Sequence, residues 1–147
     1  MKKFSFSLEK VLEYSSHLLK KEKETLQKLK AELLALNSQE TFLLKKLEHQ
    51  KNEYIRLCED GIALPLAGSR LKYIGALRDE IKELKAKIEA KKKQIETQTG
   101  VVIEVTKEKT KVEKLKEAKY KLYITNEQKE EEKFIEEFVS HKSALTA

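Results

Sequence analysis

A leucine repeat between Leu12 and Leu57 constrains the fold of this chain more than any other feature. Its positions are separated alternately by three and four residues, and most of them are apolar. They are Leu12, Ser15, Leu19, Glu22, Leu26, Leu29, Leu33, Leu36, Glu40, Leu43, Leu47, Gln50, Tyr54 and Leu57. A spacing of about 3.5 residues keeps one narrow apolar stripe facing a partner helix, as in a left-handed coiled coil. The chain therefore needs a second helix to cover this stripe.

A second stripe with the same spacing follows, and a single strong break separates the two. Its positions are Ile74, Leu77, Ile81, Leu84, Ile88, Lys91, Ile95, Gln98, Val102 and Val105. The break contains Gly61, which can end a helix in the left-handed conformation, and Pro65, which cannot continue one. We predict one helix over about residues 8–60, a turn over 61–68, and a second helix over about 69–140 with Ser69 as its N-cap.

A short turn between two long helices predicts that they fold back on each other. The predicted fold class is all-α, a long antiparallel two-helix coiled-coil hairpin, and residues 1–147 form a single coiled-coil domain. A turn at residues 61–68 sets Leu57 by Lys72 and Tyr73, Leu33 by Glu96, and Leu12 by Glu117.

The end of the second helix is predicted to differ from the rest. Gly100 and the β-branched residues after it weaken helix propensity, but we expect the helix to continue through them. Beyond Val112 the apolar stripe is expected to change phase, to Leu115, Ala118 and Leu122. Residues 122–140 lack a partner in the first helix and form an overhang, which Phe4 and Phe6 could partly cover and which could dock another protein.

Composition argues against an enzyme. The chain is 38% charged, with four Gly, one Pro and no Trp, so two thin helices leave little room for an enclosed substrate pocket. The three histidines, His17, His49 and His141, lack further ligands at metal-binding spacing, and no glycine-rich phosphate loop is present. We expect no catalytic residue, no metal and no cofactor. The single Cys58 and the N-terminal sequence, which has neither a signal-peptide pattern nor a membrane span, favour the cytoplasm.

The net charge of +6 leaves two other function classes open. The basic residues could bind nucleic acid as part of a basic coiled coil, although acidic residues alternate with the lysines and no arginine cluster accompanies them. The densest basic run, residues 91–93, fans around the helix, which favours a solvated surface.

The second alternative is a scaffold that dimerises through an intermolecular coiled coil. The tail is acidic, with three basic and six acidic side chains over residues 125–147.

Several short segments, taken in order, resemble the flagellar FliJ family. The chain opens with Phe4-x-Phe6-x-Leu8-x-x-Val11-Leu12-x-Tyr14, continues after the turn with Tyr73-Ile74-x-x-Leu77, and ends its patterned region with Glu127-Gln128-Lys129-Glu130-x-Glu132. The resemblance covers almost the whole chain. Ser15 replaces the arginine frequent in the family, and Glu131-Glu132 replaces an Asp-Glu pair.

The resemblance implies a stalk-like, non-enzymatic component of the bacterial flagellar type III export apparatus. Its implied partners are the hexameric export ATPase, a membrane protein of the export gate, and export chaperones, with no nucleic acid. The implied ATPase-ring surface comprises Phe4, Phe6, Tyr123, Gln128, Lys129, Glu132, Phe134 and Phe138. Tyr73 and Leu77 are implied on the export-gate side. The protein is expected to be a monomer in isolation, cytoplasmic, and peripheral at the inner face of the membrane through its protein partners.

Overall fold

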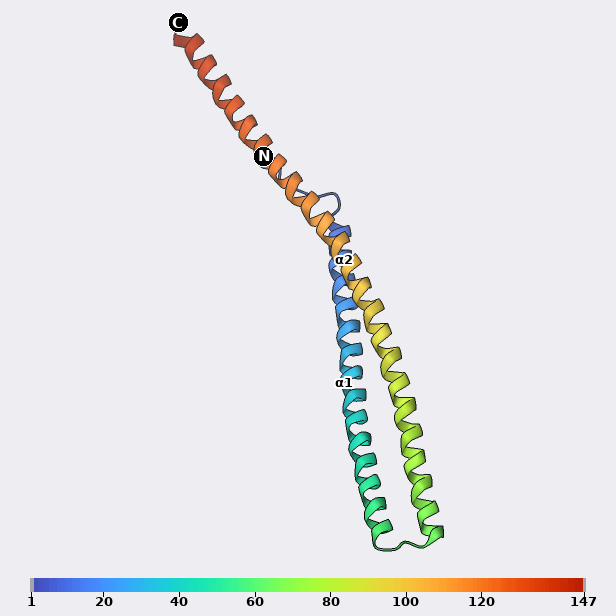
Figure 1. Ribbon diagram of the computed structural model, residues 1–147. Helices are drawn as coiled ribbons and strands as arrows, with labels where there is room; N and C mark the ends of the chain where they lie inside the picture. Colours follow the sequence, from blue (N-terminus) through green and yellow to red (C-terminus); the bar gives the residue numbers. More distant parts are fainter. Residues whose placement is uncertain (1, 147) are drawn as a thin grey trace. The chain divides into compact units, whose positions relative to one another are not determined.

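The computed structural model describes residues 2–146, except for the side chain of residue 146, and consists of two long helices (Figure 1). Helix α1 spans Glu9–Glu59 and helix α2 spans Leu64–Thr146. The two helices run in opposite directions and pack against each other, and no strand occurs among the described residues. This confirms the predicted all-α hairpin. Helix α2 extends a few residues beyond the predicted end near residue 140.

The connection between the helices is shorter than predicted. Gly61 has a φ of 81°, the left-handed conformation that ends a helix, and its amide donates to the carbonyl of Cys58 at 3.3 Å. Helix α2 then begins at Leu64 instead of near residue 69. Pro65 lies in the first turn, where its missing N–H leaves no intrahelical acceptor unpaired. The predicted turn over 61–68 and the N-cap at Ser69 are therefore wrong, because Ser69 lies inside the helix.

Contacts divide the chain into two compact units, and both helices contribute to each. One unit is Glu22–Val101, which contains the connection, and the other combines Met1–Lys21 with Val102–Ala147. The helical conformation continues through Gly100, as predicted. The assignment of the whole chain to one domain stays a prediction.

The unit Glu22–Val101 is built on the two predicted stripes. Its core cluster comprises Leu43, Leu47, Ile74, Leu77, Ile81, Leu84 and Ile88, with Leu33, Leu36 and Tyr54 packed against it. The polar positions of the stripes are also half-buried, and Lys91, Gln98 and Glu22 make contacts across the two helices. Lys91 Nζ lies 2.6 Å from Glu32 Oε2, and Gln98 Nε2 donates to the carboxylate and the backbone carbonyl of Glu22. The 3.5-residue spacing thus identified the buried face correctly, polar positions included.

The register within this unit differs from the predicted one. Lys91, not Glu96, lies opposite the Glu32–Leu33 region, and Arg70 donates to Gln50 Oε1 at 3.1 Å. The partners on α2 therefore come more than one helical turn earlier in the chain than predicted. The physical reason is the short connection: α2 begins at Leu64, so the residues facing any position of α1 come earlier along α2.

In the unit formed by the chain ends, the stripe on α2 keeps its phase. Val112, Lys116 and Tyr123 are half-buried, whereas Leu115 and Leu122 are exposed. The predicted phase change is therefore wrong. A count of apolar residues favours the leucines, but the aliphatic stem of a lysine and the ring of a tyrosine can cover a partner equally well.

Candidate protein-binding surface

An aromatic cluster joins the N-terminal segment to α2. The ring of Phe4 lies 5.2 Å from that of Tyr120 and 5.4 Å from that of Tyr123, measured between centroids, and the two tyrosine rings are 6.4 Å apart. These separations and the edge-on geometry of Phe4 against Tyr120 are favourable for aromatic pairs. Phe6 is buried, with 7% of its surface exposed. Phe4 therefore packs against α2, and its contact with Tyr123 covers the beginning of the predicted overhang.

Polar contacts surround the same cluster. The hydroxyl of Tyr123 lies within hydrogen-bond distance of two acceptors, 2.5 Å from the carbonyl oxygen of Lys2 and 2.8 Å from Glu127 Oε1. The hydrogen bond to the Glu127 carboxylate, with partial burial, raises the pKa of Tyr123 above its ordinary value. Lys116 Nζ lies 2.8 Å from Glu9 Oε2 and links α2 to the first turn of α1. The N-terminal segment and the first turn of α1 are thus both linked to this part of α2.

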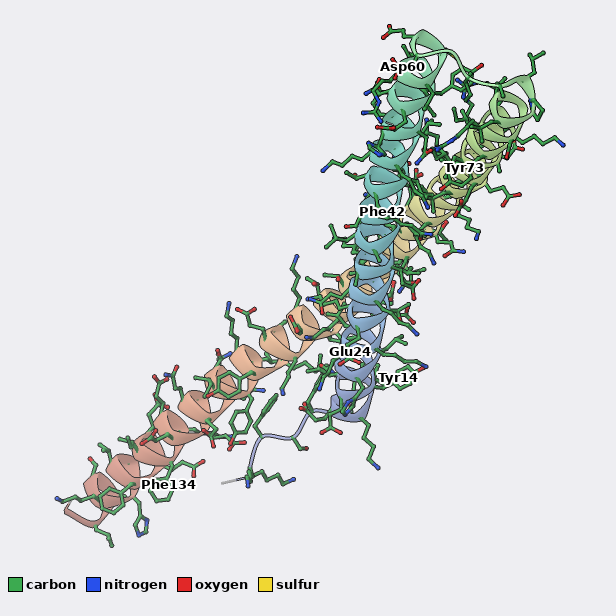
Figure 2. The ribbon with its side chains drawn as sticks, turned by 90° about the horizontal axis from the view of Figure 1, so that it is seen from below. Tyr14, Glu24, Phe42, Asp60, Tyr73 and Phe134 are labelled. Atoms are coloured by element: carbon green, nitrogen blue, oxygen red, sulfur yellow. The ribbon has the colours of Figure 1, made fainter. Side chains whose placement is uncertain are left out.

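Beyond this cluster α2 is uncovered. Gln128, Lys129 and Glu132 are exposed, and Phe134 and Phe138 expose 68% and 61% of their surfaces. Figure 2 labels Phe134 on this stretch of α2. The structure therefore separates the eight residues predicted for the ATPase-ring surface into two groups. Phe4, Phe6 and Tyr123 make contacts within the chain, and the other five face solvent.

The second predicted surface lies in the unit Glu22–Val101, and its two residues differ. Tyr73, labelled in Figure 2, is 40% exposed, and Lys46 Nζ lies 5.8 Å from the centroid of its ring. Leu77 exposes 3% of its surface and belongs to the core cluster. A partner can reach the ring of Tyr73 directly, whereas it can reach Leu77 only if the helices separate.

Sequence reasoning missed some residues of these surfaces. Tyr120 completes the aromatic cluster, and Val139 and Leu145 add exposed apolar area beside Phe134, Ile135 and Phe138. The spacing of residues along α2 could have identified Tyr120, because steps of three and four residues lead from Lys116 through Tyr120 and Tyr123 along one face of the helix. The predicted phase change to Leu115 and Leu122 indicated a different face of the helix.

Residues 2–146 contain neither a metal-binding cluster nor a membrane-spanning helix. No group of three or more His, Cys, Asp or Glu side chains in residues 2–146 is arranged to hold a metal ion. Over the same residues, no helix is long and apolar enough to cross a membrane. Cys58 is a free, exposed thiol.

Comparison with known proteins identifies a family to which the chain is similar. No curated protein and no solved structure gave a significant match. The family model described as "Flagellar FliJ protein" matches residues 4–145, which include the N-terminal segment, both helices and the uncovered end of α2. On this match the chain belongs to the flagellar FliJ family, whose members are non-enzymatic components of the flagellar type III export apparatus.

Proposed function

We propose that this chain is a stalk-like subunit that binds the hexameric flagellar export ATPase, couples it to the membrane export gate, and escorts export chaperones. The observation that carries the proposal is the uncovered end of α2 beyond the Phe4–Tyr120–Tyr123 cluster. A helix that is fixed at one end and exposes large apolar side chains beyond that point is suited to dock into another protein. The ATPase is the proposed partner of this surface.

The proposed gate contact is the surface around Tyr73. An exposed aromatic ring beside a lysine offers both apolar area and charge to a partner. Leu77 lies in the core cluster and is not proposed as a direct contact. The protein would then reach the membrane peripherally, through the gate protein, while residing in the cytoplasm.

The charge pattern does not favour a nucleic-acid function. Lysines on α2 pair with glutamates one turn away, as in Lys92–Glu89 and Lys107–Glu104, and Lys91 is directed to Glu32 on the other helix. Side chains engaged in this way present little uncompensated positive field to phosphates. The basic coiled-coil alternative therefore has no supporting observation among these contacts.

The test is an assay of ATP hydrolysis and hexamer formation by the purified export ATPase with and without this protein. We expect the wild-type chain to stimulate both. The Phe138→Ser variant is expected to lose most of the stimulation, whereas Leu122→Ser, which also removes an exposed apolar side chain from α2, keeps it. A wild-type protein that changes neither hydrolysis nor assembly would rule out the ATPase as the partner.

A further inference from the structure

The last turns of α2 carry an apolar stripe, which we call the C-terminal stripe. It consists of Phe134, Ile135, Phe138, Val139 and Leu145, each of them more than half exposed. On an α-helix with about 3.6 residues per turn, these side chains fall within an arc of about 140°. An arc of this width is typical of a helix face that packs against another helix. Every residue from 128 to 145 is exposed, so nothing in the described chain covers it.

The C-terminal stripe continues an interface that the chain already makes. Lys116, Tyr120 and Tyr123 line the face of α2 that meets α1 and the N-terminal segment. Steps of three and four residues from Tyr123 pass through Glu127 and lead to Phe134, Phe138 and Leu145, which lie on the same face within about 60°. The face that binds a helix earlier along α2 is therefore the face left open at its end.

Acidic side chains border the C-terminal stripe on both edges. Helical geometry places Glu130 and Glu137 along one edge, and Glu132 and Glu136 along the other. Lys129 and Lys133 lie on the opposite side of the helix, and within the stripe Glu131 adds a further acid and Lys142 one base. In paired helices the residues at the edges of the apolar seam select the partner by charge. Edges of one sign select a helix whose edges carry the other sign.

We infer that the C-terminal stripe binds an amphipathic helix of a partner protein whose apolar face is bordered by lysine or arginine. The inference specifies the chemistry of the partner that binds this surface, which is proposed above to contact the ATPase. It rests on that proposed function only for the identity of the protein that supplies the helix. The stripe of a second copy would bring acidic edges together, which is unfavourable. An anionic membrane surface would repel the same edges.

The test uses the full chain and two synthetic helical peptides that share one leucine stripe. One peptide has lysines along both edges of the stripe and the other has glutamates, and each carries a fluorophore for anisotropy. We expect the lysine peptide to bind and the glutamate peptide not to bind. Added NaCl should weaken the complex, because the edge charges are exposed to solvent. Phe138→Ser should weaken it roughly tenfold or more, since a large apolar contact is lost.

Two variants serve as controls. Leu122→Ser, on another face of α2, should leave the affinity unchanged, and the double variant Glu130→Gln/Glu137→Gln should lower both the affinity and its salt dependence. Because all these positions are exposed, circular dichroism should show the same helix content in every variant. Equal binding of both peptides, or binding that Phe138→Ser does not change, would refute the inference.

Four further outcomes are decisive. Binding of the chain to vesicles of phosphatidylcholine and phosphatidylglycerol that Phe138→Ser abolishes would assign the stripe to a membrane. Self-association abolished by the same variant would assign it to a second copy. If the lysine peptide binds but the ATPase is not stimulated, the inference stands and the proposed function fails. If Phe138→Ser abolishes stimulation but the lysine peptide does not bind, the proposed function stands and the inference fails.

Discussion

Glu32 and Lys91 form the shortest ion pair between the two helices among those described, with 2.6 Å between Lys91 Nζ and Glu32 Oε2. The hydrogen bond and the charge of Lys91 hold the pKa of the Glu32 carboxyl below its ordinary value. A carboxyl whose pKa is lower in the folded state stabilises the fold above its unfolded pKa. This contribution is lost as the pH falls through the lower, folded pKa.

We therefore expect Lys91→Gln to lower the Tm at neutral pH and to lower it less as the pH falls into the acidic range. The measurement is thermal unfolding of wild type and variant by circular dichroism between neutral and acidic pH. Lys92→Gln is the matched control, because its pair with Glu89 lies on one helix with both side chains exposed, where such pairs contribute little. A difference between wild type and Lys91→Gln that does not shrink with falling pH would contradict this account. NMR titration should also show the pKa of Glu32 rising in Lys91→Gln.

At the scale of the element, two glycines near the connection have opposite conformational requirements. Gly61 has a φ of 81°, whereas Gly68 is a helical residue of α2, and open space surrounds the Cβ position of each. Gly61→Ala should lower the free energy of unfolding by about 1–2 kcal/mol, because an L-residue is strained in the left-handed region. Gly68→Ala should raise it by about 0.5–1 kcal/mol, since alanine favours the helix.

Urea unfolding of Gly61→Ala and Gly68→Ala measures both changes in the free energy of unfolding. Opposite shifts of the unfolding midpoint at an unchanged slope are expected. If Gly68→Ala also destabilised the protein, residue 68 would belong to the connection and α2 would begin after it. The pair thus tests where α2 starts, the point on which the register depends.

The helices themselves could be predicted from the sequence, but their pairing could not. The 3.5-residue spacing located the buried face, because side-chain direction along a helix depends on spacing alone and holds for Glu22 and Gln98 as well as for the leucines. The register depended on how Pro65 was interpreted. Proline both ends helices and begins them, and the local sequence does not distinguish these roles.

The candidate surface was predictable in part for a similar reason. Phe134 and Phe138 are identifiable as exposed because they lie beyond any residue of α1 that could face them. The contact between Phe4 and Tyr120 joins an irregular segment to a distant helix, and no periodicity encodes such a contact. Only tertiary packing determines that Leu122 is exposed while Tyr123 is half-buried.

At the scale of the whole molecule, the hairpin bears on the expected oligomeric state. The stripe of α1 is covered by α2 of the same chain, and core residues such as Leu43 and Ile81 come from both helices. An intermolecular coiled coil would have to replace these contacts with equivalent ones and also lose translational freedom. We therefore expect a monomer in isolation, and the C-terminal stripe, bordered by acidic residues, should not change this.

Sedimentation equilibrium over a range of micromolar concentrations measures this state directly. A single species with the 17.1 kDa mass of the chain is expected, and lowering the salt concentration should not produce a dimer. Low salt strengthens the repulsion between acidic edges and would strengthen any attraction between edges of opposite sign. A dimer that forms at low salt and is lost in the double variant Glu130→Gln/Glu137→Gln would mean that the acidic edges pair with basic residues of a second copy. The chain would then be a self-assembling scaffold, and not a monomer whose open helix face is available to another protein.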